Sequence, residues 1–190
     1  MNEPTTVSAP GGPRVREMTL ADCARVAEIR VRGWQSAYEG LIPQTYLDGL
    51  SVTADAERRR RRLEEGDGSV VNLVAERDGS VAGWACHGPH RDGEVRAGDV
   101  ELYAIYVHPD LLGRGVGQAL LRESVRRCAA AGHERMLLWV LEENTRARRF
   151  YERAGFRPDG AEEPFEADGV AVPEVRYTRA LTGEGPDRQP

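Results

Sequence analysis

The sequence lacks the long hydrophobic runs that membrane proteins carry. Across its 190 residues there is no apolar stretch of about 18 residues, the length from which a helix can cross a bilayer. The first residues also lack the apolar segment of a secretory signal peptide. We therefore expect no membrane partner and a cytoplasmic location.

Cysteine is scarce as well. The three cysteines, Cys23, Cys86 and Cys128, are scattered, odd in number and without the paired Cys or Cys/His spacing of a zinc site. A disulfide framework is excluded, and we expect no metal. Cys128 shares an apolar helical stripe with Leu121 and Val125, which predicts a small core residue.

Basic residues are fewer than acidic ones, 26 against 31, and the net charge is −5. Such a balance argues against nucleic-acid binding. The exception is a run of five arginines over residues 58–62, which alone would suggest a polyanion ligand. On a helix, ion pairs at i,i+4 spacing would join Glu57 with Arg61, Arg60 with Glu64, and Arg61 with Glu65. We therefore predict a solvated helix face and no nucleic-acid partner.

The composition predicts one domain. Hydrophobic residues make up 40% of the chain, enough for a sizeable core in a protein of this length. Residues 1–13 and 182–190 are rich in Pro, Gly and polar residues, so we predict two disordered tails around a single domain over residues 14–181.

Hydrophobic periodicity predicts alternating strands and helices. Strands are expected over residues 14–18, 72–76, 81–87, 101–107, 136–141 and 173–180. Helices are expected over residues 20–38, with Thr19 as N-cap, and around residues 44–47 and 57–65. Two more are expected after Gly117, ending at Gly132, and from Asn144 to Gly155. Asp78-Gly79 predicts a hairpin turn. The fold class is α/β (α+β) with a mixed sheet.

A glycine-rich loop separates the strand over residues 101–107 from the helix that follows it. Gly113, Gly115 and Gly117 allow successive backbone N–H groups to turn toward one point. The unpaired N–H groups and the dipole of the helix favour an anion there, and Arg114 adds a full positive charge. Gln118 stands where a dinucleotide-binding motif needs its third glycine or alanine. The loop therefore predicts a phosphate or pyrophosphate site of another kind.

Two motifs resemble those of one family. Residues 112–117 resemble the Gln/Arg-x-x-Gly-x-Gly/Ala motif of the GCN5-related N-acetyltransferase (GNAT) superfamily, with Leu112 in place of Gln/Arg. Residues 144–156 resemble its Asn-x-x-Ala-x-x-Phe-Tyr-x-x-x-Gly-Phe motif. A pattern of Trp, Tyr, Gly, Pro and Tyr over residues 34–46 is similar to a group of bacterial members. The resemblance covers roughly residues 14–180.

The resemblance implies a GNAT fold, whose mostly antiparallel central sheet is splayed between its fourth and fifth strands and flanked by helices. It also implies acetyl-CoA as co-substrate. The pantetheine arm would pair with the backbone of the fourth strand, and the glycine loop would hold the pyrophosphate. The implied binding residues are Ile105, Tyr106, Val107, Leu112, Gly113, Arg114, Gly115, Val116, Gly117, Gln118 and Asn144.

The chemistry of amine acetylation needs a base and an acid. An aliphatic ammonium has a pKa of about 10.4 and must lose a proton before it attacks. Glu101 precedes Arg114 by 13 residues, the spacing at which some family members carry a catalytic glutamate; the alternative is an exposed glutamate at the start of a strand. Tyr151, two helical turns after Asn144, resembles the acid that protonates the departing sulfur; the alternative is a core tyrosine beside Phe150.

The sequence therefore predicts an N-acetyltransferase that moves acetyl from acetyl-CoA to a primary amine by direct attack in a ternary complex. A small-molecule acceptor is preferred over a peptide amine. A protein Lys or N-terminal acetyltransferase and a non-catalytic acyl-CoA sensor are the alternatives. A homodimer is left open.

Overall fold

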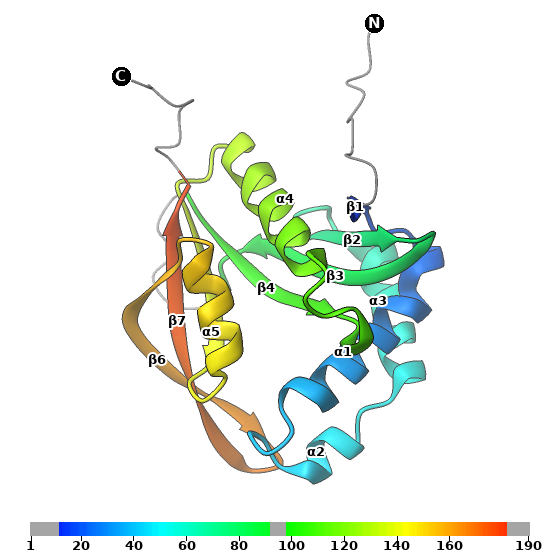
Figure 1. Cartoon of the computed structure of the whole chain (residues 1–190), viewed down its shortest axis with the longest axis vertical. Coiled ribbons are helices and arrows are strands. Elements are labelled where there is room, and N and C mark those ends of the chain that lie inside the picture. The colour runs from blue at the N-terminus through cyan, green and yellow to red at the C-terminus, as the bar shows by residue number, and fades with distance from the viewer. Residues whose placement is uncertain (1–11, 92–97, 182–190) are drawn as a thin grey trace, which may run out of the picture.

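The computed structural model describes residues 12–91 and 98–181, and these residues form a seven-stranded sheet with helices on both faces (Figure 1). The strand order is β1-β2-β3-β4-β5-β7-β6. The strands are β1 (Arg14–Glu17), β2 (Val71–Arg77), β3 (Ser80–Pro89), β4 (Asp99–Val107), β5 (Arg135–Leu141), β6 (Arg157–Ala167) and β7 (Val170–Ala180). The helices are α1 (Cys23–Ala37), α2 (Gln44–Asp48), α3 (Val52–Glu65), α4 (Val116–Ala130) and α5 (Thr145–Arg153).

The first four strands pair antiparallel, each with the next. Asp78 and Gly79 join β2 to β3 with φ angles of 51° and 77°, the left-handed pair that a type I′ hairpin turn requires. The predicted hairpin is therefore confirmed.

The sheet splits between β4 and β5. These two strands run parallel and pair only where Asp99–Glu101 lies beside Arg135–Leu137. Beyond Glu101 they diverge, and β5 pairs along its whole length with β7 instead (Figure 1). The predicted mixed sheet, mostly antiparallel and splayed between its fourth and fifth strands, is confirmed.

The sequence interpretation missed β6 and started β7 at Pro173 instead of Val170. The reason is proline, which cannot donate a hydrogen bond to a sheet ladder. Pro158 and Pro164 lie in β6, which is tolerated because β6 is an edge strand. Pro173 pairs with Pro164 at a point of β7 beyond the end of its pairing with β5.

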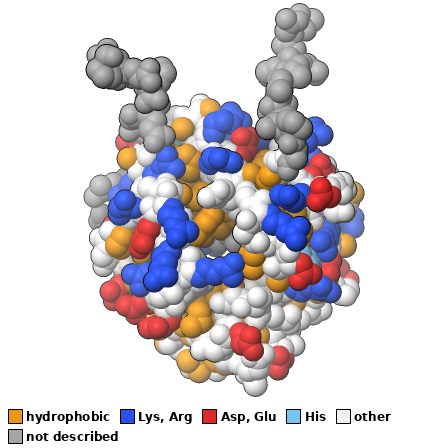
Figure 2. Space-filling view, viewed as in Figure 1, with side chains coloured by type: hydrophobic (Ala, Val, Ile, Leu, Met, Phe, Trp, Pro, Cys, Tyr) orange, Lys and Arg blue, Asp and Glu red, His pale blue; other side chains and the backbone are white. Residues whose placement is uncertain are grey.

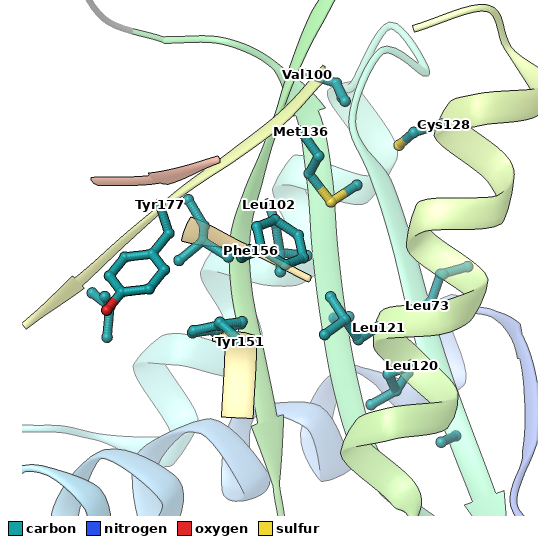
Figure 3. Close-up of a cluster of buried hydrophobic side chains, with 14 of the residues drawn as sticks. Leu73, Val100, Leu102, Leu120, Leu121, Cys128, Met136, Tyr151, Phe156 and Tyr177 are labelled. Atoms are coloured by element: carbon teal, nitrogen blue, oxygen red, sulfur yellow. The ribbon is translucent and has the colours of Figure 1, made fainter. Parts of the chain in front are cut away.

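Helices α4 and α5 cover one face of the sheet, and α1 and α3 lie on the other. The main core fills the space between α4, α5 and the sheet (Figure 3). Leu121, Met136 and Phe156 are fully buried there together with Cys128. Burial raises the pKa of the Cys128 thiol to about 12, so the predicted core role of this cysteine is confirmed.

Two helix predictions need correction. Helix α1 begins at Cys23, because residues 20–22 form a separate 3₁₀ turn in which Thr19 bonds to Asp22. Helix α3 begins at Val52 rather than Glu57, where the Ser51 hydroxyl accepts a hydrogen bond from the Ala54 N–H (3.2 Å). Serine is a favoured N-cap residue, so the start of this helix had a local signal that the sequence prediction missed.

The predicted i,i+4 ion pairs on α3 are wrong. Asp55, a buried residue in the first turn of α3, forms ion pairs with Arg58 (2.8 Å) and Arg59 (2.6 Å) instead. The arginines at 58 and 60–62 are exposed as predicted, whereas Arg59 is largely covered.

Within residues 12–91 and 98–181, no helix has both the length and the apolar character needed to cross a bilayer. Both predicted tails fall outside the described residues except for Gly12 and Pro13. The single domain over residues 14–181 stays a prediction.

Candidate functional site

A cleft of about 600 Å³ opens where β4 and β5 diverge. Its walls come from β4, β5, the glycine loop and the facing sides of α1, α4 and α5. They include Gly33, Ser36, Tyr38, residues 102–107, Leu112, Gly113, residues 115–118, Trp139, Val140, Asn144, Arg146, Ala147, Phe150, Tyr151 and Arg153. We call this space the cleft.

The edge of β4 supplies backbone hydrogen-bonding groups to the cleft. The His108 N–H donates to Ala82 O (2.9 Å), and hydrogen-bonded pairs alternate along an antiparallel ladder. Val107 and Ile105 are therefore the residues of β4 whose N–H and C=O groups turn away from β3. Because β5 has diverged there, these groups face the cleft.

The glycine loop closes one end of the cleft. Gly113 and Gly115 have φ angles of 77° and 79°, and neither has a neighbour within 4 Å of an added Cβ. Glycine is required at both by backbone conformation, not by crowding. Gly115 is the N-cap of α4 and offers no side chain to the first N–H groups of the helix. These donors are open to an anion.

Gly117 differs from the other two glycines. It lies inside α4, and an added Cβ would meet the Phe150 ring and Val107 at 3.5 Å, which is ordinary contact. A small side chain would fit there, whereas a branched one would protrude into the cleft wall.

Basic side chains surround the cleft. Figure 2 shows Arg side chains on both sides of a hollow with an apolar floor, on the face that carries α4 and α5. Arg146 and Arg153 of α5 line the cleft. Arg114 is exposed and does not line it; its carbonyl accepts a hydrogen bond from Arg77 (2.9 Å). The positive charges that could pair with a phosphate-bearing ligand in the cleft are therefore mainly those of Arg146 and Arg153 on α5.

Asn144 lies at the start of α5. Its side-chain oxygen caps α5 by accepting from the Ala147 N–H (3.1 Å), and the residue also lines the cleft. The N-cap role predicted from sequence is confirmed.

Three tyrosines meet at the bottom of the cleft. Tyr151 is 9% exposed and packs edge-on against Phe150 and Phe156. The hydroxyls of Tyr38 and Tyr106 lie 3.2 Å apart. Burial raises the pKa of Tyr151 and of both other phenols, so all three are protonated at neutral pH.

A second and larger cavity, about 1260 Å³, lies on the other face of the sheet between α3 and strands β2, β3 and β4. We call it the α3 groove. Tyr103, Ala104 and Tyr106 line both the groove and the cleft. A β-bulge at Tyr103, opposite Cys86 and His87, turns Tyr103 and Ala104 toward the groove together. The two cavities therefore approach each other across β4.

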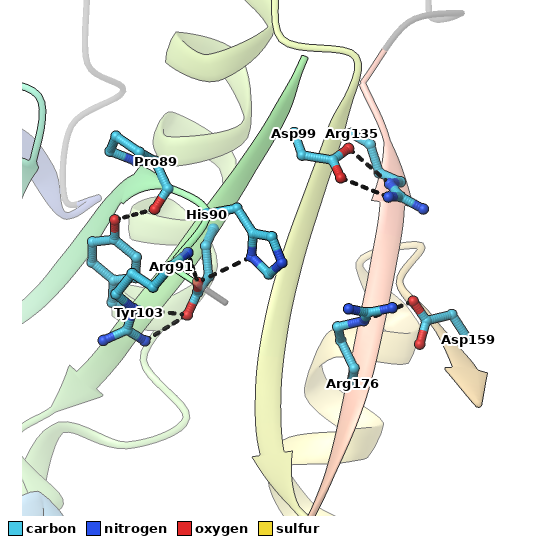
Figure 4. A network of polar contacts seen from close by, with 9 residues as sticks. Pro89, His90, Arg91, Asp99, Tyr103, Arg135, Asp159 and Arg176 are labelled. Atoms are coloured by element: carbon cyan, nitrogen blue, oxygen red, sulfur yellow. Dashed lines mark hydrogen bonds and ion pairs between the residues drawn. The ribbon is translucent and has the colours of Figure 1, made fainter. Parts of the chain in front are cut away.

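Glu101 of β4 is buried in a polar network with His90 and Arg91, both of which are labelled in Figure 4. It is 1% exposed, which contradicts the alternative of an exposed strand glutamate. The guanidinium of Arg91 donates to Oε1 (2.5 Å) and the Arg91 backbone N–H donates to Oε2 (3.1 Å). His90 Nδ1 lies 3.3 Å from Oε2. His90 and Arg91 line the α3 groove, whereas Glu101 stands behind them.

The structure thus gathers all but two of the residues predicted from sequence around the cleft, the exceptions being Glu101 and Arg114. Sequence reasoning missed Trp139, Arg146 and Arg153 as lining residues. Arg146 and Arg153 could have been found, since they lie two turns apart on the helix that starts at Asn144.

Comparison with known proteins gives a family match. The model of the acetyltransferase (GNAT) family matches residues 34–156. This range includes the cleft, the glycine loop and both motifs described above.

Individual relatives cover most of the chain. An uncharacterized N-acetyltransferase of Bacillus subtilis, YuaI, is 34% identical over 162 residues, covering 85% of this chain and 89% of YuaI. The L-amino acid N-acyltransferase MnaT of Escherichia coli is 29% identical over 143 residues, 75% of this chain and 78% of MnaT. A GNAT superfamily phosphinothricin acetyltransferase from Sinorhizobium meliloti, solved in complex with AcCoA, superposes with a TM-score of 0.68 at 26% identity, covering 94% and 92% of the two chains.

Proposed function

The chain belongs to the GNAT family of acetyltransferases, and from this membership we propose that it transfers acetyl from acetyl-CoA to a primary amine of a small molecule, by direct attack in a ternary complex. One observation carries the proposal. Two cavities on opposite faces of the sheet approach each other at the unpaired stretch of β4, so two substrates can meet there.

The cleft fits acetyl-CoA. Unpaired N–H and C=O groups at Ile105 and Val107 match an amide-bearing pantetheine arm, which would add to the edge of β4 like a strand. The N–H groups at the start of α4, with Gly113 and Gly115 in left-handed conformations, suit a pyrophosphate. The binding of AcCoA by the Sinorhizobium meliloti relative supports this assignment.

The acceptor amine would enter from the α3 groove and lose its proton there. Glu101 is the proposed base, and its polar network suggests the route by which the proton of the amine reaches it. His90 lines the groove and lies 3.3 Å from the Glu101 carboxylate, so His90 can pass the proton of the ammonium to the buried carboxylate. Holding amine and thioester in line replaces a bimolecular encounter.

The amine nitrogen then forms a bond to the acetyl carbon, and the bond from that carbon to sulfur breaks. The Ile105 N–H would stabilise negative charge on the acetyl oxygen. Tyr151, protonated and at the bottom of the cleft, would donate its proton to the departing thiolate. The products are the N-acetylated amine and the CoA thiol.

A small acceptor is the choice made from the sequence, and the α3 groove, at about 1260 Å³, has room for one. MnaT, which is named an L-amino acid N-acyltransferase, is in line with this choice. All residues in the proposal belong to one copy of the chain. Three buried free cysteines fit a reducing compartment such as the cytoplasm.

The test is release of CoA thiol from acetyl-CoA with a panel of small amines, amino acids and short peptides. The sequence contains no lysine, so acetylation of the enzyme's own lysines cannot contribute to the signal. Turnover with a small amine would support the proposal. Turnover confined to peptides would point to a protein acceptor, and tight acetyl-CoA binding without any turnover would point to a sensor.

A further inference from the structure

The arginine run is divided between two faces of α3. Arg58, Arg59 and Arg62 line the α3 groove, whereas Arg60 and Arg61 do not. Two more arginines, Arg30 from α1 and Arg91 after β3, line the same groove. Five guanidinium groups from three separate segments therefore gather around one cavity.

The carboxylates of the groove do not balance these arginines. Asp55, 3% exposed, receives Arg58 (2.8 Å), Arg59 (2.6 Å) and Arg30 (3.2 Å). One negative charge thus faces three positive ones. The pKa of Asp55 is lowered even though burial works in the opposite direction, because these arginines outweigh it.

The remaining charges of the groove reduce this excess to one positive charge, because Glu101, Asp67 and Asp168 stand against Arg62 and Arg91. Arg91 binds Glu101. Asp67 accepts from the Ser69 N–H (2.8 Å), and Asp168 accepts from the Thr45 hydroxyl (2.7 Å), far from α3 in sequence. Within the described residues, the Arg62 guanidinium has no hydrogen-bond or ion-pair partner.

Arg59 shows how the groove is held open. Its guanidinium lies 3.9 Å from the centroid of the Trp84 ring while it binds Asp55. This side chain connects the helix to the sheet, and its guanidinium is already bound by protein groups. Arg58 and Arg62 lie one turn apart on α3 and are more exposed than Arg59. Arg62 is open to a ligand, and Arg58 can add the guanidinium donors that its hydrogen bond to Asp55 does not use.

We infer that the α3 groove recognises an anionic group on the acceptor, a carboxylate or phosphate oxyanion bound by Arg62 and Arg58. The inference rests on the proposed function, because it assigns one end of the acceptor to α3 and leaves the amine at the β4 end beside Tyr103 and Tyr106. Guanidinium groups suit this task, since they present paired donors that match two oxygens of a carboxylate or phosphate.

The test compares acceptors that differ only in the anionic group. 4-Aminobutyrate is paired with 4-aminobutyramide, and 2-aminoethyl phosphate with 2-methoxyethylamine. We expect kcat/KM to be at least about tenfold higher for the anionic member of at least one pair. The pair with the larger ratio tells whether the groove prefers a carboxylate or a phosphate. Equal rates for both members of both pairs would overturn the inference.

Variants of α3 provide matched controls. Arg62→Met should raise KM for the anionic acceptor about tenfold, with little change in kcat and no change for the neutral partner. Arg61→Met removes the same charge from the same helix outside the groove and should behave like the wild type. Equal effects of the two variants would show that only overall charge matters, against the inference.

Direct binding separates this inference from the acetyl-transfer proposal. Calorimetric titration with 4-aminobutyrate and with 2-aminoethyl phosphate, in the presence of CoA, needs no turnover. Binding that is lost in Arg62→Met but kept in Arg61→Met would support the anion site even if no amine were acetylated. Absence of binding and of turnover with every anionic probe would overturn it.

Discussion

Burial controls the charge of the side chains that face the two cavities. The phenols at the bottom of the cleft keep their protons because ionisation there would leave a poorly solvated charge. Glu101 is buried more deeply, yet it lies against a guanidinium and two further polar groups. The cleft side of β4 therefore offers a proton donor, and the groove side a carboxylate that is connected to a histidine.

Tyr151→Phe should lower turnover by about 10²–10⁴-fold, since it keeps the ring and removes only the proton donor. Affinity for acetyl-CoA should change little. Steady-state rates and calorimetric titration measure the two quantities. Phe150→Leu is a control in the same wall that leaves the hydroxyl in place. Wild-type turnover in Tyr151→Phe would remove this residue from the mechanism.

Glu101→Gln should depress turnover near neutral pH and recover in part at high pH, where more of the acceptor amine is already deprotonated. The pH profile distinguishes a base from a purely structural glutamate. A structural role would lower the rate by the same factor at every pH. Because Arg91 loses a charged partner, the unfolding midpoint of the variant should be measured alongside.

Glu174 on β7 gives a prediction about stability. Burial, with Glu163 and Glu101 nearby, raises the pKa of its carboxyl to about 7. Between about pH 4.5 and 7 the folded protein then binds more protons than the unfolded chain, so this group makes stability fall as pH rises. Glu174→Gln should remove that loss and be more stable than the wild type at pH 8 by about 1–2 kcal/mol, allowing for partial exposure.

Urea unfolding of Glu174→Gln and the wild type between pH 5 and 8 measures this difference. The gap between the two curves should widen as pH rises. Glu166→Gln, on an exposed position of the adjacent strand β6, should follow the wild type. A constant gap across the pH range would contradict the assignment.

Elements whose signals are local in sequence could be predicted. Strand, glycine loop and helix follow one another around Gly115, and Asn144 and Gly155 bound α5 by capping rules. Strand β6 could not be predicted, because its prolines are acceptable only at a sheet edge, and the edge is a property of the whole sheet. The start of α3 at Ser51 was missed although its capping signal is local.

Gly115→Val should weaken acetyl-CoA binding by at least about tenfold, because a branched residue resists the left-handed conformation that directs the first N–H groups of α4. Gly132→Val is the matched control. Gly132 follows the other end of α4 with φ of 86° and has no neighbour within 4 Å of an added Cβ. Both variants should lose similar stability, and only the first should lose affinity. Equal affinities by calorimetry would contradict the role of the loop.

At the scale of the whole molecule, the function depends on surfaces that distant segments build together. The cleft could be predicted, since both of its motifs lie within the family resemblance. The α3 groove could not, because Arg30, Arg62 and Arg91 come from three segments whose meeting depends on how α1 and α3 pack against the sheet. Read along the sequence, residues 58–62 are one run of charge; in the fold they are two groups with different surroundings.

That division also bears on binding to nucleic acid. A polyanion needs a wide basic surface, but the chain carries a net charge of −5, and Asp55 forms ion pairs with Arg58 and Arg59 on the same helix. Only Arg60 and Arg61 of the run lie wholly outside the groove. We therefore predict no salt-sensitive affinity for duplex DNA or RNA at physiological ionic strength. Fluorescence anisotropy with a labelled duplex between about 50 and 200 mM salt measures this. Binding that weakens steeply with salt, and that Arg60→Met and Arg61→Met reduce together, would show that the outer face of α3 is a nucleic-acid surface after all.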